Sequence, residues 1–206
     1  MALDLEEQDQ LDALKTWWKA NGGMVSTAVL IVAVCFSAFK GWEFYQRQQS
    51  LQASTRYDEM THLAETDLKP IKAISGELME KYASTPYAAR AAIAAAKANY
   101  TAKDTKSAKA QLQWAADHAK EDAVRAIALL RLAALQVADK ELDASLKTLA
   151  EKHDPAFDGL FADLKGDVLL AQDKKPEAKL AYEDALSKLD ADGRYHRYTE
   201  YKLEAL

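Results

Sequence analysis

The sequence predicts an all-α protein in which a single N-terminal transmembrane helix precedes an array of helical hairpins. Three observations support this prediction. The run from Ala20 to Phe39 does not contain a single charge. Glycine and proline are scarce, at 7 and 4 residues in a chain of 206, whereas strong helix formers such as alanine and leucine are abundant. Beyond residue 46 the apolar residues recur at helical spacing, and no alternating β-branched run appears.

The uncharged run has the length of a membrane-spanning helix. At about 1.5 Å per residue, such a helix reaches about 30 Å, which is the thickness of the hydrocarbon core of a bilayer. Trp17 and Trp18 precede the run and Trp42 follows it, as expected of aromatic rings at the two headgroup levels. We therefore expect a transmembrane anchor over residues 20–45, continuing as one helix to about Ala64.

Other interpretations of this run are disfavoured. A buried core helix is rarely so long, and a cleaved secretory signal begins with basic residues. Here residues 1–19 hold five acids and two lysines, and no small-residue cleavage site follows the run. A lipoprotein signal requires a small residue before its cysteine, whereas Val34 precedes Cys35. Lysine and arginine are nearly balanced on the two sides of the span, so charge counting leaves the orientation open.

Composition excludes some classes of function. The net charge is −5, and no stretch clusters like charges, so the sequence does not support a nucleic-acid surface. The only cysteine, Cys35, lies in the predicted span. The remainder of the chain therefore cannot form disulfides, which is compatible with either the cytoplasm or the periplasm.

The chain beyond the anchor predicts helix after helix, joined by short polar turns that favour antiparallel pairs. Residues 53–83, where Pro70 is expected to open a helix, are predicted to form a degenerate half-repeat, and the last helix is polar enough to cap the array. The helices that follow residue 83 are expected at about 87–101, 105–119, 122–138, 141–152, 156–172, 175–189 and 194–205.

The helix pairs share a register of small residues. Each of Ala96, Ala133 and Gly166 is followed 12 residues later by another small residue, and then by a bulky one, at intervals of 37 and 33 residues between units. This register resembles the tetratricopeptide repeat, a helix–turn–helix unit of about 34 residues. Lys152 departs from the pattern because it stands where a small residue is expected. The alternative is an ordinary helical bundle with alanine-rich seams.

No catalytic chemistry is evident in the sequence. The four histidines are scattered, and no metal-binding, phosphate-binding or nucleophile motif is present. Asp163 and Asp167 share a helix face and could poise an acid and a base, but no nucleophile or third ligand accompanies them, so a solvated face is favoured. We expect no enzyme activity, no metal and no cofactor.

Repeat arrays of this kind form a groove lined by the first helix of each unit, and such a groove suits a protein segment. The middle unit is expected to be wholly apolar. The alternative is that these positions are core residues covered by the helices of 53–83. The predicted protein-binding positions are Arg90, Ile93, Lys97, Tyr100, Ile127, Leu130, Ala134, Val137, Leu160, Asp163, Asp167 and Leu170.

The whole chain resembles the YfgM-type family, the ancillary subunit of the bacterial Sec (SecYEG) translocon. The resemblance is carried by short motifs in a common order: Asp9-Gln10-Leu11, Trp17-Trp18, Asn21-Gly22, Gly41-Trp42, Ala110-Gln111-Leu112-Gln113, Leu130-Arg131-Leu132-Ala133 and Ala162-Asp163-Leu164.

The resemblance implies a type II inner-membrane protein with a cytoplasmic acidic amphipathic tail (1–19), an anchor (20–45) and a periplasmic repeat domain (46–206). It implies an interaction module at the translocon exit, with the Sec translocon, a membrane-anchored periplasmic chaperone of the prolyl-isomerase class and nascent secretory chains as partners. The alternative is a regulator of an envelope stress response that acts through its cytoplasmic tail. A scaffold for outer-membrane or cell-wall assembly is a weaker third interpretation.

Overall fold

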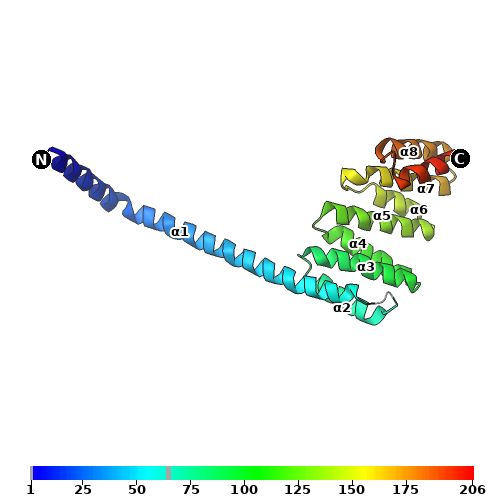
Figure 1. Ribbon diagram of the computed structural model, residues 1–206, viewed down its shortest axis with the longest axis horizontal. Helices are drawn as coiled ribbons and strands as arrows, with labels where there is room; N and C mark the ends of the chain where they lie inside the picture. The colour runs from blue at the N-terminus through cyan, green and yellow to red at the C-terminus, as the bar shows by residue number, and fades with distance from the viewer. Residues whose placement is uncertain (1, 64–65) are drawn as a thin grey trace. The chain divides into compact units, whose positions relative to one another are not determined.

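The computed structural model describes residues 2–63 and 66–206, with side chains from Asp9 onward. These residues form helices and turns without any β-strand, which confirms the all-α prediction (Figure 1). The chain divides into two compact units, one up to Gln48 and the other from Gln49 to Leu206.

The first unit is helical throughout and has an exposed apolar surface. Helix α1 (Ala2–Thr61) runs unbroken beyond Tyr45, as expected, whereas its predicted end near Ala64 lies outside the described residues. The side chains of Val32 and Phe36 are 67% and 61% exposed. Apolar surface left in water costs about 25 cal/mol per Å², a cost that a lipid environment removes. The helix is long and apolar enough to cross a membrane.

The second unit is a succession of short helices in which each packs on the next, so that chain neighbours are also spatial neighbours. The α-helices that follow α1 are α2 (Leu68–Lys81), α3 (Pro86–Thr101), α4 (Thr105–His118), α5 (Asp122–Ala138), α6 (Leu142–Leu149), α7 (Asp158–Ala171), α8 (Lys175–Lys188) and α9 (Arg194–Glu204). One turn of 3₁₀ helix, η1 (Pro155–Phe157), lies between α6 and α7. Helix α5 packs against α7 as well as against α6.

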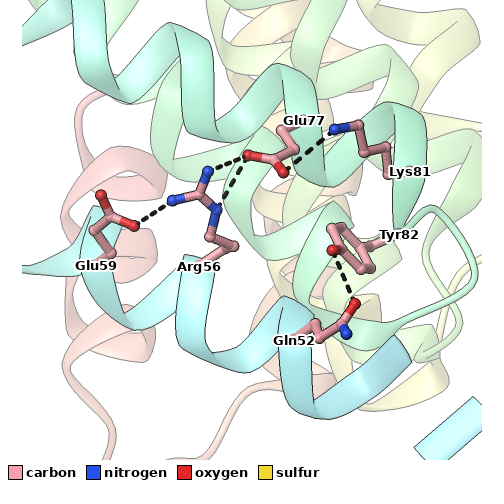
Figure 2. A network of polar contacts seen from close by, with 6 residues as sticks. All are labelled: Gln52, Arg56, Glu59, Glu77, Lys81 and Tyr82. Atoms are coloured by element: carbon pink, nitrogen blue, oxygen red, sulfur yellow. Dashed lines mark hydrogen bonds and ion pairs between the residues drawn. The ribbon is translucent and has the colours of Figure 1, made fainter. Parts of the chain in front are cut away.

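The end of α1 and helix α2 form the first hairpin of the second unit. Ala53 of α1 and Leu78 of α2 are fully buried in one apolar cluster. Beside them, Arg56 donates to Glu77 of α2 through Nη2 (2.7 Å) and to Glu59 of its own helix through Nη1 (2.7 Å), as Figure 2 shows. The hydrogen bond from Arg56 lowers the pKa of the Glu77 carboxyl. The predicted degenerate half-repeat is therefore a packed helix pair.

The predicted register of small residues lies in the seams between paired helices. Ala96, Ala133 and Gly166 are all buried. Gly166 allows the closest approach, because a Cβ built on it would lie 2.5 Å from Cδ1 of Tyr182, whose side chain is fully buried against α7. Ser145 donates its hydroxyl to the carbonyl of Ala133 at 3.0 Å. The small residues therefore let the two helices of a unit approach each other.

The three full repeats are the helix pairs α3–α4, α5–α6 and α7–α8, and the turn between the two helices has the same backbone geometry in each pair. Lys103, Lys140 and Asp173, which follow α3, α5 and α7, all have φ values between 60° and 68°. In each turn the next amide donates to a carbonyl five residues upstream, as in the Schellman motif that ends many helices. These residues recur at the predicted 37- and 33-residue intervals.

Helix α6 is shorter than expected, because it ends at Leu149 rather than near residue 152. Pro155 follows closely, and the residue before a proline is driven out of the helical region. Asp154 accordingly has an extended backbone, with φ −67° and ψ 126°. Lys152 therefore lies in a loop rather than in a helix seam, which explains why it can depart from the small-residue pattern.

Candidate protein-binding groove

The predicted groove residues of the first full repeat lie on one face of α3. Pro86 occupies the first turn of this helix, where the missing amide hydrogen costs nothing. Arg90, Ile93, Lys97 and Tyr100 are three or four residues apart and therefore line up along the helix. Ile93 is buried, whereas Lys97 and Tyr100 are exposed.

Two hollows open beside this face of α3. Hollow A, of about 490 Å³, has the end of α1 as one wall and α3 and α5 as the other; its lining includes Tyr57, Met60, Ile71, Arg90 and Ile127. The lining thus brings together side chains of three hairpins. The helices of 53–83 form a wall of the hollow instead of filling it.

Hollow B, of about 300 Å³, lies between α3 and α5. The apolar residues that line it include Ala96, Tyr100, Leu112, Ala134 and Leu135. The two hollows share Ile93, Lys97 and Arg131, so together they form one apolar groove, referred to below as the α3/α5 groove.

Arg90 fixes the start of α5 relative to α3. Its guanidinium donates from Nη1 to Oε1 of Glu121 at 2.7 Å and from Nη2 to Oε2 at 2.6 Å. Glu121 occupies the position just before α5, so this bidentate pair ties the two groove-forming helices together. The hydrogen bonds from Arg90 lower the pKa of the Glu121 carboxyl.

Arg131 is the charged groove residue that the sequence prediction missed, and apolar lining residues such as Tyr57 and Leu112 were missed as well. Arg131 lines both hollows. The middle unit was expected to present only apolar residues to the groove, and Arg131 departs from that expectation. Its position, four residues after Ile127 on the same helix face, could have indicated it. Leu130 and Val137, which were predicted to line the groove, instead pack against the main apolar core.

The predicted groove residues of the third full repeat lie apart from the two hollows. Lys202 of α9 donates to Asp163 and Asp167 of α7, each at 2.8 Å, and Tyr182 also donates to Asp167. Burial lowers the pKa of Lys202, but the hydrogen bonds to the two carboxylates more than offset this effect and leave it raised. Leu160 is half-buried and Leu170 is exposed on the same helix. Helix α9 therefore occupies the acidic face of α7, and the two aspartates act as its anchor.

A further hollow, of about 590 Å³, lies away from the groove between α6, α7 and α8. Two pairs of oppositely charged residues lie in its lining. His153 Nε2 lies 3.1 Å from Asp158 and stacks on Phe161, while Lys188 donates to Asp184 at 2.8 Å. Because its lining carries charges of both signs, this hollow is less suited than the α3/α5 groove to a partner of one charge. Among the side chains that the structure describes, no group of three His, Cys, Asp or Glu residues is placed to hold a metal ion.

These features define a helical-repeat protein that has an open apolar groove and a helix long and apolar enough to cross a membrane. Comparison with known proteins supports this class. The family model described as "Tetratricopeptide repeat-like domain" matches residues 15–206. No solved structure matches the chain.

Curated relatives cover nearly the whole length of the chain. A protein of Haemophilus influenzae is 30% identical over 90% of this chain and 91% of its own length. One of Neisseria gonorrhoeae is 29% identical over both full lengths, and one of Escherichia coli is 28% identical over 86% of this chain and 85% of its own. Each of the three is named an ancillary SecYEG translocon subunit. The chain belongs to this family of tetratricopeptide repeat-like proteins, which confirms the resemblance drawn from its sequence.

Proposed function

We propose that this protein is a non-catalytic interaction module that associates with the SecYEG translocon and binds a partner protein through the α3/α5 groove. Family membership supports the association, since the relatives are named as translocon subunits. The single observation that carries the binding role is the groove itself, with its apolar floor and its exposed Lys97 and Tyr100. Apolar grooves of this kind accept amphipathic protein segments.

The proposed topology is type II in the bacterial inner membrane. Residues 1–19 lie in the cytoplasm, residues 20–45 span the bilayer, and residues 46–206 form the periplasmic domain. The exposed apolar side chains of α1 support the span, since in water they would carry a large free-energy cost. The domain's partners are the translocon, a membrane-anchored chaperone of the prolyl-isomerase class, and secretory chains as they emerge. The anchor raises the local concentration of the groove at the site of emergence.

Photocrosslinking in native membranes tests this function. A photoreactive residue replaces Tyr100 or Ala134 in the groove, and Leu180, which is 65% exposed on α8, serves as the matched control outside the groove. We expect a translocon subunit, the chaperone or a nascent secretory chain to be captured from the two groove positions and not from Leu180. Equal capture from all three positions, or none from the groove, contradicts the proposal. Capture of a cytoplasmic regulator from residues 9–19 instead would favour a stress-response role.

Cysteine labelling tests the topology. The variant Cys35→Ser removes the native thiol, and a new cysteine is introduced as Ser187→Cys on the exposed surface of α8. A membrane-impermeant maleimide should label this cysteine in cells whose outer membrane alone has been opened. A cysteine at position 13, introduced as Ala13→Cys, should react only after the inner membrane is disrupted. The reverse pattern would overturn the type II orientation.

A further inference from the structure

Lys97 and Arg131 occupy the place where hollow A and hollow B meet. Both residues line both hollows, and both are exposed. Ile93, which the two hollows also share, is only 8% exposed. The groove therefore has an apolar floor with two cationic side chains above it.

The charge of the groove is opposite to that of the chain. The described residues that line the two hollows include Arg90, Lys97 and Arg131 but no carboxylate, although the net charge of the protein is −5. The charge of Arg90 is matched by Glu121. Arg131 forms no ion pair with any side chain that the structure describes. A concentration of one sign of charge around a hollow with apolar walls attracts ligands of the other sign.

We infer that the α3/α5 groove recognises an acidic amphipathic protein segment, in which carboxylate side chains accompany large apolar ones. This inference rests on the proposed function, because it states the chemistry of the partner that the same groove binds. The apolar side chains of the segment enter hollows A and B, and a carboxylate pairs with Arg131. The guanidinium of arginine suits this pairing, since it can donate two parallel hydrogen bonds to one carboxylate.

The shape of the groove favours a protein segment over other anionic ligands. The two hollows, of about 490 and 300 Å³, lie next to each other and share a wall. A helix that carries apolar side chains three or four residues apart presents two such groups side by side, with polar residues at its flanks. Anionic lipid is the competing ligand, because its phosphate and acyl chain offer the same combination of chemistry.

Binding of synthetic peptides to the full-length protein in detergent micelles tests the inference. The peptides form two matched sets with identical leucine and phenylalanine positions, one flanked by glutamate and the other by lysine, and fluorescence anisotropy measures their affinity. We expect the glutamate set to bind more tightly and to lose affinity as salt is added, since salt screens exposed charges. Equal affinity for the two sets, or no binding by either, overturns the inference.

A charge reversal in the groove sharpens this test. Arg131→Glu should weaken binding of the glutamate set by roughly tenfold or more, as expected for the loss of a charge-assisted hydrogen bond, and should improve binding of the lysine set. Lys106→Glu, an exposed position on α4 outside both hollows, makes the same change in net charge and should leave both affinities unaltered. Equal effects of the two variants would contradict a role for Arg131. Displacement of the glutamate peptides by vesicles rich in anionic lipid, but not by neutral vesicles, would assign the groove to lipid.

The failure of this inference can be distinguished from the failure of the proposed function. If photocrosslinking from Tyr100 captures a translocon-associated partner but the two peptide sets bind equally, the groove binds proteins without a preference for acidic segments. The opposite result is also informative. If the glutamate peptides bind and lose affinity in Arg131→Glu, but photocrosslinking from the groove captures no translocon-associated partner, the groove prefers acidic segments and its proposed role at the translocon is wrong.

Discussion

At the scale of single residues, the packing of the repeats depends on where a side chain is absent. Gly166 faces the ring of Tyr182, and any Cβ at this position would overlap it. Gly76, in contrast, lies exposed on α2 with open space around it. The two glycines are both helical, yet only one is needed for close approach. The sequence register indicated Gly166, because it occupies the position held by alanine in the other repeats.

Substituting these two glycines should have opposite effects on stability. Gly166→Ala forces α7 and α8 apart or displaces the Tyr182 ring, and we expect it to lower the free energy of unfolding by about 1–3 kcal/mol. Gly76→Ala improves helix propensity without any clash and should raise the free energy of unfolding by up to about 1 kcal/mol. Urea unfolding followed by far-UV circular dichroism measures both values. A neutral Gly166→Ala would show that the α7–α8 seam tolerates wider spacing.

At the scale of elements, the ends of the helices determine how the repeats follow one another. The three left-handed residues, Lys103, Lys140 and Asp173, reverse the chain between the paired helices of each unit. Ion pairs then tie one unit to the next: Lys72 of α2 pairs with Asp104 at 3.2 Å, and Lys109 of α4 pairs with Glu141 at 2.8 Å. Equivalent contacts thus recur from one repeat to the next.

Glycine at a left-handed turn position should stabilise the fold. A residue with a Cβ has a conformational cost in this region that glycine does not have. We therefore expect Lys140→Gly to raise the free energy of unfolding by about 1 kcal/mol, less the entropy that glycine loses on folding. The matched control, Lys147→Gly within α6, should lower it by about 1 kcal/mol. A shift of the urea midpoint in the same direction for both variants would contradict this explanation.

At the scale of the whole molecule, the apolar helix and the repeat domain are separate compact units. The second unit, from Gln49 to Leu206, contains all three buried apolar clusters that the described residues form. Its last helix covers the acidic face of α7 through Lys202. The groove lies within this unit, so its binding chemistry does not require residues of the first one.

A fragment of residues 49–206 should therefore fold without the apolar segment. We expect it to remain soluble without detergent and to unfold at the same urea concentration as the full chain in micelles, because the apolar clusters are intact in both. Analytical ultracentrifugation and circular dichroism measure these properties. Aggregation of the fragment, or a clearly lower midpoint, would show that residues before Gln49 contribute to the stability of the repeat domain.

Most of the architecture could be predicted from local patterns. An uncharged run with aromatic flanks indicates a span, and periodic apolar and small residues indicate helix pairs, because both signals depend on neighbours along the chain. The exception, the early end of α6, also has a local cause in Pro155. The register also marks Lys152 as irregular, in agreement with its position in the loop after α6.

The lining of the groove could not be predicted in the same way, because it depends on contacts between residues that are distant in sequence. Periodicity placed Ile93 and Lys97 on one face, but it could not show that Tyr57 of α1 and Arg131 of α5 would meet them around the same hollows. Nor could it show that Lys202 would hold Asp163 and Asp167 beneath α9. A helical pattern specifies which side of a helix is buried, whereas the partner of that side depends on how all the helices pack together.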